Sequence, residues 1–421
     1  MQVTVGFAFN ASAELNAADA LGGVVKVFQV AASAMADAPL DNVQVQIPWS
    51  PASNTSLPQF SATCWFSGKS VALGRAGADR SVPLGLIASS WGGTAIKVHA
   101  SPAANAACGA LYPGGNISAP GADCGLDHAP CTPSCLFNAM IAPFFAGPMA
   151  IAAAIWFQGE NDADLPEISG GYYACQLGHL IADWRAGFAS PSAHFTTVQL
   201  APFLTSAPLA AFRDMQCATT GAAANASCAV IVDDGDPLSP IGSVHSRNKE
   251  LVGRRVAAGI LAHVYGVNTD AASQLGPRYA GVVSVNSAGS PLSATVAFAP
   301  ETVVGGLVYV APHVDAWQNS SRCPTELPGV TLSACGFFGI LGTDGVWYNA
   351  SSASANPDNT LTITAAAAPA TAAVAGTRFG WAAWPVVNHY NAKGLPMVPW
   401  SANGGVTAGR ARLAPKADSK E

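Results

Sequence analysis

The sequence predicts an α/β fold in which helices cover both faces of a parallel sheet, followed by a smaller, mainly β domain. Strand-like and helix-like segments alternate over residues 1–280, which is typical of parallel sheets. After residue 280, short β-prone runs are separated by Gly, Pro, Ser and Asn. Half of the 421 residues are hydrophobic and a tenth are charged, so the chain can bury a large core. We therefore expect two domains, 1–280 and 281–421.

Apolar runs in the first domain predict its strands, and helical spacing of apolar residues predicts its helices. The expected strands are 24–30, 82–90, 149–157, 194–202 and 228–234, and the expected helices include 175–188 and 247–266.

The segment 137–157 carries no charged residue and is nearly long enough to span a membrane. Asn138, Pro143 and the pair Gly147-Pro148 interrupt it, however. A short helix, a turn and a buried parallel strand explain the segment better, so we expect no membrane span.

Charge and cysteine content narrow the class of protein. The net charge is −6 and no basic stripe is present, which argues against nucleic acid as a partner. Ten cysteines and six Asn-X-Ser/Thr sequons favour an oxidising compartment, either outside the cell or in a lysosomal or endomembrane lumen, although reduced cytosolic thiols stay possible. The sequons begin at Asn10, Asn54, Asn116, Asn225, Asn319 and Asn349.

Polar or glycine-rich segments follow three of the predicted strands. We name them the glycine turn (residues 89–94, SSWGGT), the amide loop (158–162, QGEND) and the histidine loop (233–249, DDGDPLSPIGSVHSRNK). Because parallel strands present their carboxyl ends at one edge of a sheet, ligands bind there, and we expect the three segments to converge.

Together these segments supply groups suited to acyl transfer. Gly92 and Gly93 can offer backbone N–H groups to a substrate oxyanion, and Asn161 or Gln158 can add a side-chain amide. His245 follows an acidic segment, which suits a general base oriented by a carboxylate.

Simpler interpretations stay open for each segment taken alone. The glycine pair can be only a tight turn, and the amide loop only the start of a helix. A single histidine is often structural, and the aspartates of the histidine loop can form a turn or a calcium site. The combination of all three segments at strand ends favours an enzyme.

The chain resembles the sialate O-acetylesterase family of SGNH-type serine esterases. The resemblance extends over nearly the whole chain, through segments such as PLGLIASSWGGTAI (83–96), IWFQGEND (155–162), DDGDPLSPIGSVHSRNKELVGRR (233–255) and RFGWAAWPVVNHYNAKGLPMVPW (378–400). It implies a three-layer α/β/α, flavodoxin-like hydrolase core that removes acetyl groups from sugars, notably O-acetylated sialic acids. It also implies a serine nucleophile, a histidine base and an oxyanion hole, with no metal or other cofactor.

The resemblance assigns roles within this pattern. His245 is the expected base, oriented by Asp236, with Asp234 as the alternative carboxylate, because no aspartate lies two or three residues before His245. The amide loop becomes the oxyanion block beside the sugar, with Asn161 as donor and Gln158 in reserve, and with Glu160 binding substrate. Gly92 and Gly93 complete the oxyanion hole.

Two replacements depart from the family pattern. Ala95-Ile96-Lys97 and His99 stand where the family usually has Pro-Ile-Glu and then Trp, which weakens any expectation of sugar contacts there. His245 is followed by Ser246 where the family usually has Pro.

The family nucleophile lies in the motif Gly-Gln-Ser-Asn-Met-Gln, and this sequence opens with the last two of those residues, Met1-Gln2. From the resemblance we therefore expect the serine, and the central strand that carries it, to lie upstream of Met1. We also expect residues 1–421 alone to have little or no esterase activity. Ser70 lacks the strand-to-turn setting of a nucleophile.

Alternative functions and cysteine chemistries remain. The chain can be a non-catalytic carbohydrate-binding derivative, in which Trp381, Trp384 and Trp400 stack on sugars, although core packing is the simpler role for them. It can also be an esterase of acetylated polysaccharides. The cluster Cys108, Cys124, Cys131 and Cys135, near Asp127 and His128, favours disulfides in a surface insertion over a zinc site, because its spacing is not a standard one.

Overall fold

The computed structural model describes residues 3–112, 132–163, 171–286, 291–315, 319–324, 327, 335–369 and 371–403. The helices are α1 Ala11–Ala18, α2 Ala62–Gly74, α3 Ile96–His99, α4 Pro102–Cys108, α5 Glu160–Ala163, α6 Tyr172–Gly187, α7 Leu209–Ala222 and α8 Lys249–Tyr265. The strands before residue 270 are β1 Val25–Val30, β2 Val45–Pro51, β3 Leu84–Ala88, β4 Ala153–Trp156, β5 His194–Val198 and β6 Ala226–Ala229.

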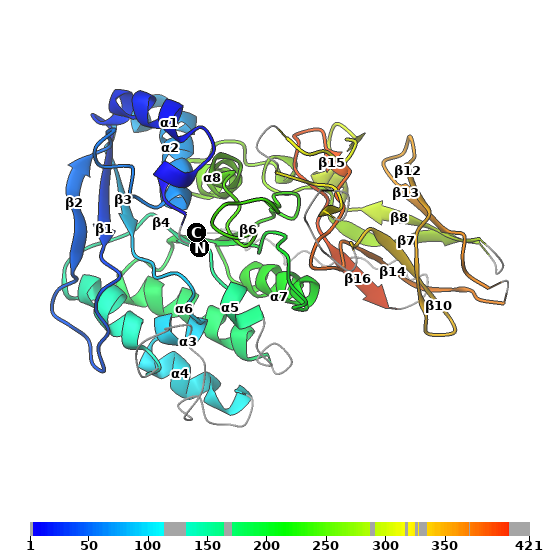
Figure 1. Ribbon diagram of the computed structural model, residues 1–421, viewed down its shortest axis with the longest axis horizontal. Coiled ribbons are helices and arrows are strands. Elements are labelled where there is room, and N and C mark those ends of the chain that lie inside the picture. The colour runs from blue at the N-terminus through cyan, green and yellow to red at the C-terminus, as the bar shows by residue number, and fades with distance from the viewer. Residues whose placement is uncertain are drawn as a thin grey trace, which may run out of the picture.

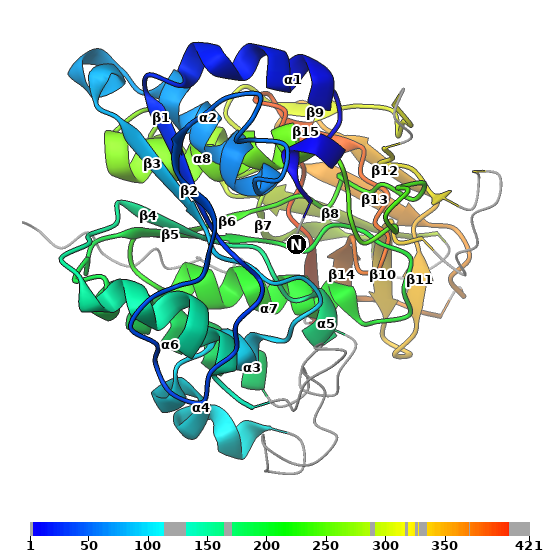
Figure 2. The same cartoon turned by 60° about the vertical axis from the view of Figure 1, so that its left-hand side comes forward.

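The N-terminal part has three layers, with α1, α2 and α8 on one side of the strands and α3, α4, α6 and α7 on the other (Figures 1 and 2). The strands form two sheets of three, in the orders β2-β1-β3 and β4-β5-β6. All neighbours are parallel except β1 and β2. The predicted α/β fold with a parallel sheet is confirmed, but within the described residues β3 and β4 end separate sheets.

Four of the five expected strands contain β1, β3, β4 and β5. The fifth, expected at 228–234, is displaced, because β6 ends at Ala229. Val230 and Val232 leave the sheet and are buried in the core formed by the C-terminal strands. Their hydrophobicity therefore reflects packing between the two parts of the chain rather than strand pairing.

Both expected helices are present, as α6 and α8. The Asn248 side chain accepts a hydrogen bond from the Leu251 N–H and begins α8, and Gly266, at φ +65°, ends it. The uncharged segment from residue 137 forms a π-helix at Phe137–Ile141, a 3-10 helix at Ala142–Ala146 and then β4, as expected. None of the described helices is long and apolar enough to cross a bilayer.

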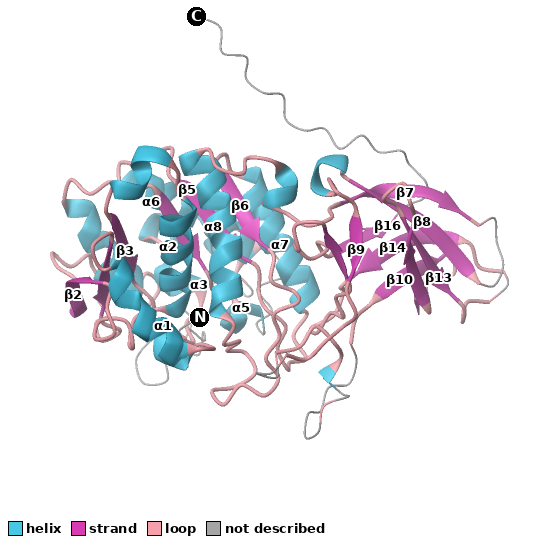
Figure 3. Ribbon diagram, turned by 90° about the horizontal axis from the view of Figure 1, so that it is seen from above, coloured by secondary structure: helices cyan, strands magenta, loops and turns pink. Residues whose placement is uncertain are grey.

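The C-terminal part is antiparallel, and Figure 3 shows it beside the layered part. Its sheets have the orders β12-β13-β8-β7, β11-β10-β14-β16 and β15-β9. Its strands are β7 Tyr279–Val285, β8 Leu292–Phe298, β9 Leu307–Tyr309, β10 Phe338–Gly342, β11 Trp347–Asn349, β12 Ser352–Ala355, β13 Leu361–Ala365, β14 Val374–Phe379, β15 His389–Asn391 and β16 Trp400–Asn403. The change to antiparallel pairing falls close to the boundary expected at residue 280.

Disulfides join Cys108 to Cys175, Cys217 to Cys228, and Cys323 to Cys335. Cys135 is a buried free thiol, and Cys124, Cys131, Asp127 and His128 lie outside the described residues. Cys108 therefore bonds across to α6 rather than within its own cluster, which removes it from the conceivable zinc site.

Two glycines on different helices give a matched test of the packing of α2 against α8. A Cβ on Gly253 of α8 would lie 2.4 Å from the backbone of Phe66, whereas a Cβ on Gly178 of α6 meets nothing within 4 Å. We expect Gly253→Ala to lower the free energy of unfolding by about 1–3 kcal/mol through overpacking. Gly178→Ala should raise it by about 0.5–1 kcal/mol, because alanine favours helix. Urea denaturation of both variants measures this, and equal effects would contradict the close helix contact.

Candidate active site

A buried carboxylate holds the glycine turn and the amide loop together. Asp162 is 1% exposed, and its two oxygens accept the Ile96 N–H at 3.0 and 3.2 Å. Its Oδ2 also accepts from Nε2 of Gln158, and the same nitrogen donates to the Thr94 carbonyl at 2.9 Å. The loops after β3 and β4 are therefore fixed to each other through Asp162 and Gln158.

These contacts determine which amide is free to serve as oxyanion donor. The Nε2 of Gln158 has both hydrogens engaged, and its Oε1 lies 3.2 Å from the donating Tyr173 hydroxyl. Within the described residues, by contrast, Nδ2 of Asn161 is buried and has no hydrogen-bond partner. A buried amide donor without a partner is costly unless a ligand takes the hydrogen bond. The geometry thus favours Asn161 over Gln158.

Glu160, the predicted substrate-binding residue, has a similar unpartnered atom. Its Oε1 is buried and without a hydrogen-bond partner in the described part of the chain. The amide loop therefore presents an acceptor and a donor on consecutive residues. Gly159 permits this bend, because its φ is +135° and a Cβ there would lie 2.4 Å from the Phe212 ring.

Gly92 and Gly93 lie in the exposed turn after β3, and Gly93 has φ +74°. Among the described residues, no acceptor is hydrogen-bonded to either backbone N–H. Both groups are thus available to a substrate oxygen. The two replacements after this turn are buried instead: Lys97 is 1% exposed and donates to the Tyr112 hydroxyl, and His99 is 6% exposed and pairs with Thr94.

His245 is half-buried, and its Nδ1 lies 2.6 Å from the carbonyl oxygen of Ile241. A carbonyl can only accept, so Nδ1 carries the hydrogen and the neutral ring leaves Nε2 unprotonated. An unprotonated Nε2 is the state that a general base requires. A backbone carbonyl thus fixes the tautomer of His245, a task that the sequence analysis had assigned to the carboxylate of Asp236.

Asp236, the carboxylate predicted to orient His245, forms a salt bridge with Arg247 instead. Its Oδ2 accepts Nε of Arg247 at 2.6 Å and the backbone N–H at 3.2 Å, and its Oδ1 accepts Nη2 at 3.1 Å. Asp236 is fully buried. It fixes the chain two residues after His245, so its described contacts act on the position of the histidine rather than on the ring.

Asp234, the alternative carboxylate, holds the neighbouring residue. Its Oδ2 accepts the Ser246 hydroxyl at 2.8 Å, and its Oδ1 accepts Nδ2 of Asn319 at 3.0 Å. Burial raises the pKa of Asp234 to about 7, and the charge of Lys249 opposes that rise. Asn319 belongs to one of the sequons, but it is 4% exposed and its amide is engaged.

Residues of the C-terminal part pack against the histidine loop. Trp384 is fully buried, and a Cβ on Gly235 would lie 2.2 Å from its ring, so only glycine fits between Asp234 and Asp236. The Ser320 N–H donates to the Gly235 carbonyl at 2.7 Å. Trp384 and Trp400 are core residues, and the sugar-stacking role considered for them is not supported.

Lys249, the last residue of the histidine loop, lies beside the start of the amide loop. Its Nζ is 5.1 Å from the centroid of the Phe157 ring, and Phe157 directly precedes that loop. The glycine turn and the amide loop are therefore joined through Asp162 and Gln158, and the histidine loop approaches the amide loop at Lys249. Neither Asp162 nor Ile241 was predicted to have a role, although each lies within one of the three predicted segments.

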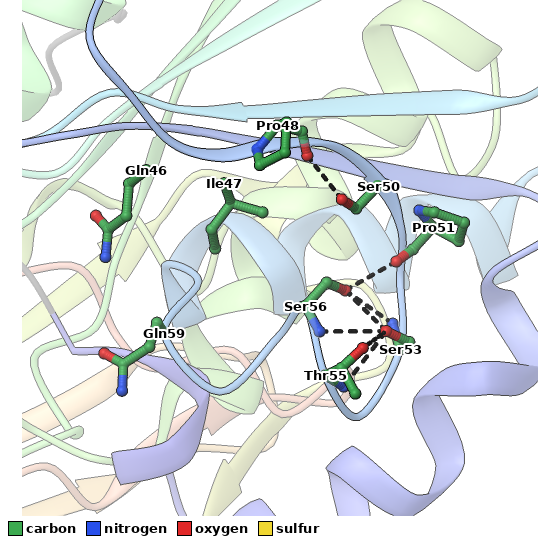
Figure 4. A pocket seen from close by; sticks show the side chains of 9 residues that line it. All are labelled: Gln46, Ile47, Pro48, Ser50, Pro51, Ser53, Thr55, Ser56 and Gln59. Carbon is green, nitrogen blue, oxygen red and sulfur yellow. Dashed lines mark hydrogen bonds between the residues drawn. The ribbon is translucent and has the colours of Figure 1, made fainter.

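A surface hollow elsewhere contains none of the predicted site residues. Figure 4 shows it between β2 and the loop that follows, with Ser53, Thr55 and Ser56 on one side and Gln46 and Gln59 on the other. The hydroxyls are hydrogen-bonded to one another, so the hollow offers few free polar groups.

Comparison with known proteins identifies the family. Residues 25–259 match the family described as carbohydrate esterase, sialic acid-specific acetylesterase, and the chain belongs to this family. The sialate O-acetylesterase of Rattus norvegicus is 32% identical over 308 residues, which cover 63% of this chain and 55% of the rat protein. That of Homo sapiens is 32% identical over 289 residues, covering 63% and 52%. The chain thus spans about half the length of the curated relatives it matches.

A solved structure supports the fold over almost the whole chain. A carbohydrate acetylesterase from Xanthomonas citri superposes with a TM-score of 0.71 at 23% identity, covering 96% of this chain and 78% of that protein. The resemblance noted in the sequence is therefore confirmed at the level of family and fold.

Replacing Asp162 tests whether the two loops depend on it. In Asp162→Asn, an NH₂ group replaces one of the oxygens that accept from Ile96 and Gln158, which leaves buried donors facing each other. We expect the free energy of unfolding to fall by about 1–3 kcal/mol. Asp214→Asn, the same change at an exposed position on α7, should have little effect. Denaturant titration of both variants gives their free energies of unfolding. Equal values would show that the contacts of Asp162 with Ile96 and Gln158 do not stabilise the fold.

Proposed function

We propose that the protein is a carbohydrate O-acetylesterase that hydrolyses acetyl esters of sialic acids by serine-type acyl transfer. The observation that carries this proposal is the buried, unpartnered Nδ2 of Asn161, linked through Asp162 and Gln158 to the glycine turn. Such a donor beside free backbone N–H groups suits the oxygen of a tetrahedral intermediate. The family match and the naming of its curated relatives as sialate O-acetylesterases support the same reaction.

In this proposal each residue has one role. Nε2 of His245 takes the proton from the attacking hydroxyl and returns it to the sugar oxygen that leaves. Asn161, with the N–H groups of Gly92 and Gly93, stabilises the oxyanion. Glu160 accepts a hydrogen bond from a sugar hydroxyl, and Asp236 holds the histidine through Arg247.

The nucleophile stays a prediction from the resemblance, as the serine of a Gly-Gln-Ser-Asn motif. Among the described residues, no serine hydroxyl is hydrogen-bonded to the ring of His245, which leaves its Nε2 open to a serine from such a motif. Activity tests use the native protein.

A second candidate substrate is an acetylated neutral polysaccharide. The carboxylate of a sialic acid calls for a cation, but Arg247 is paired with Asp236 and Arg255 with Asp233. These two arginines beside the site are therefore already neutralised. The ratio of kcat/KM for an O-acetylated sialic acid and for an acetylated neutral glycan decides between the two substrates.

The disulfides are typical of proteins that fold in an oxidising compartment. We propose secretion or residence in a lysosomal or endomembrane lumen. Asn10, Asn54 and Asn349 are exposed at their sequons and fit glycosylation, whereas Asn319 does not.

Asn161→Ala tests the proposal directly. Loss of one oxyanion donor should lower kcat on an acetyl ester by about 10²- to 10³-fold, with KM nearly unchanged. Asn403→Ala, at an exposed position on β16 outside any sequon, serves as the control and should retain full activity. Gln158→Ala should instead lower stability and activity together, because Gln158 holds the loops. An Asn161→Ala enzyme with normal kcat would refute the proposed oxyanion hole.

A further inference from the structure

The sheet β11-β10-β14-β16 has one face in the core and one face outside it. Phe338, Ile340 and Phe379 belong to the hydrophobic core of the C-terminal part. Neighbouring residues on a strand point to opposite faces, whereas residues opposite each other in the register share a face. Gly339 and Arg378, which are opposite each other, therefore lie on the outer face of the sheet.

Two residues of β11, the edge strand of this sheet in the described structure, lie on the same outer face. Asn349 is opposite Gly339 in the register, and Trp347 precedes Asn349 by two residues, so both side chains point to one side. Asn349 is exposed and Trp347 is half-buried. A partly exposed tryptophan on an edge strand promotes association with other chains unless something covers it.

The side chain of Arg378 extends the surface that Trp347 begins. Its Cζ lies 4.3 Å from the centroid of the Trp347 ring, and a Cβ on Gly339 would lie 3.0 Å from its Nε. The arginine therefore lies across Gly339 and against the tryptophan. Within the described residues no carboxylate pairs with the guanidinium and no hydrogen bond engages it, so its N–H groups are free to donate.

An aromatic ring beside free guanidinium N–H groups has the chemistry of a sugar-binding surface. The C–H groups of a pyranose ring pack against the aromatic face, and the sugar oxygens accept hydrogen bonds from the guanidinium. None of the proposed catalytic residues lies on this face of the sheet, so the surface is suited to holding a sugar without reacting with it.

The chain can supply such a sugar itself, at Asn349. Residues 349–351, Asn-Ala-Ser, form a sequon, and β11 ends at Asn349, so the amide is accessible. Residues two apart on a strand are separated by about 7 Å. A sugar attached to Asn349 therefore begins beside the ring of Trp347.

We propose that Asn349 carries an N-linked glycan whose first N-acetylglucosamine packs on Trp347 and Arg378. The donor is a lipid-linked oligosaccharide diphosphate. A bond forms between Nδ2 of Asn349 and C1 of the sugar, the bond from C1 to the diphosphate oxygen breaks, and the amide releases one proton. The inference rests on the proposed secretory compartment and is independent of the proposed esterase reaction.

Covalent attachment favours a glycan of this chain over a free saccharide as the occupant. A free sugar loses translational and rotational freedom when it binds, which opposes weak stacking contacts. An attached sugar loses less, because its linkage gives it a high effective concentration at the surface. Contact with one tryptophan and one arginine is then sufficient.

The experiment uses the native protein from a eukaryotic secretory host. Mass spectrometry of its glycopeptides should find a glycan on Asn349. Asn349→Gln should raise the equilibrium constant of unfolding, measured by urea denaturation, about threefold to tenfold, as loss of one aromatic contact does. Trimming with an endoglycosidase that leaves the first N-acetylglucosamine should not change the constant, because only that sugar contacts the protein.

A second sequon gives the matched control. Asn54 is exposed like Asn349, but the residue two positions before it, Ala52, is buried and not aromatic. Asn54→Gln should therefore leave the unfolding constant unchanged. Trp347→Ala lowers stability by itself, so the informative quantity is the coupling: in this background Asn349→Gln should have no further effect.

Several outcomes would overturn the proposal. They are an unmodified Asn349, equal effects of Asn349→Gln and Asn54→Gln, and an effect of Asn349→Gln that persists in Trp347→Ala. Loss of stability on trimming to the first sugar also contradicts it, since outer sugars would then make the contact. None of these measurements needs an acetyl ester, so failure of the proposed function is distinguished from failure of this inference.

Discussion

The carboxylate of Asp162 is the contact on which the candidate site depends. It lies in the core, accepts the backbone N–H of Ile96 and engages the amide of Gln158, which in turn binds Thr94. A charged acceptor that is saturated by donors is strongly held in a buried environment. Two loops that are 64 residues apart in sequence thereby become one rigid surface. Gln158 is engaged in these contacts, whereas Nδ2 of Asn161 has no hydrogen-bond partner among the described residues.

A second cluster of charge organises the histidine loop by a different principle. Each aspartate there has its own cation or donor: Asp233 has Arg255, Asp236 has Arg247, and Asp234 has Ser246 and Asn319. The orientation of the His245 ring itself is left to a neutral carbonyl. The aspartates hold the backbone of the loop, and the Ile241 carbonyl orients the ring. This division explains how the loop can carry three aspartates without any of them bonding to the ring in the described structure.

The fold class could be predicted from the sequence, and so could the glycine turn and the amide loop, which the structure joins in the candidate site. Alternating apolar runs located β1, β3, β4 and β5, because burial inside a covered sheet selects such residues. The choice between Asn161 and Gln158 as the candidate oxyanion donor needed coordinates. Both side chains are amides, and only their contacts show that the Gln158 amide is already hydrogen-bonded. The role of Ile241 was out of reach, because every residue has a carbonyl and its use leaves no mark on residue type. The Cys108–Cys175 bond and the turn at Val230 likewise arise from long-range packing.

The contact between Trp384 and Gly235 has a consequence for where the polypeptide can be divided into fragments. The family match ends at residue 259, which invites the view that the remaining strands are an appendage. Yet Trp384 fills the space that a side chain at position 235 would occupy, while Asn319 and Ser320 bind the same aspartate-rich turn. A minimal fragment ending at the match would expose the back of that turn to water. The histidine loop and Trp384 therefore form one packing unit, and transfer of the layered part to another scaffold requires this tryptophan as well.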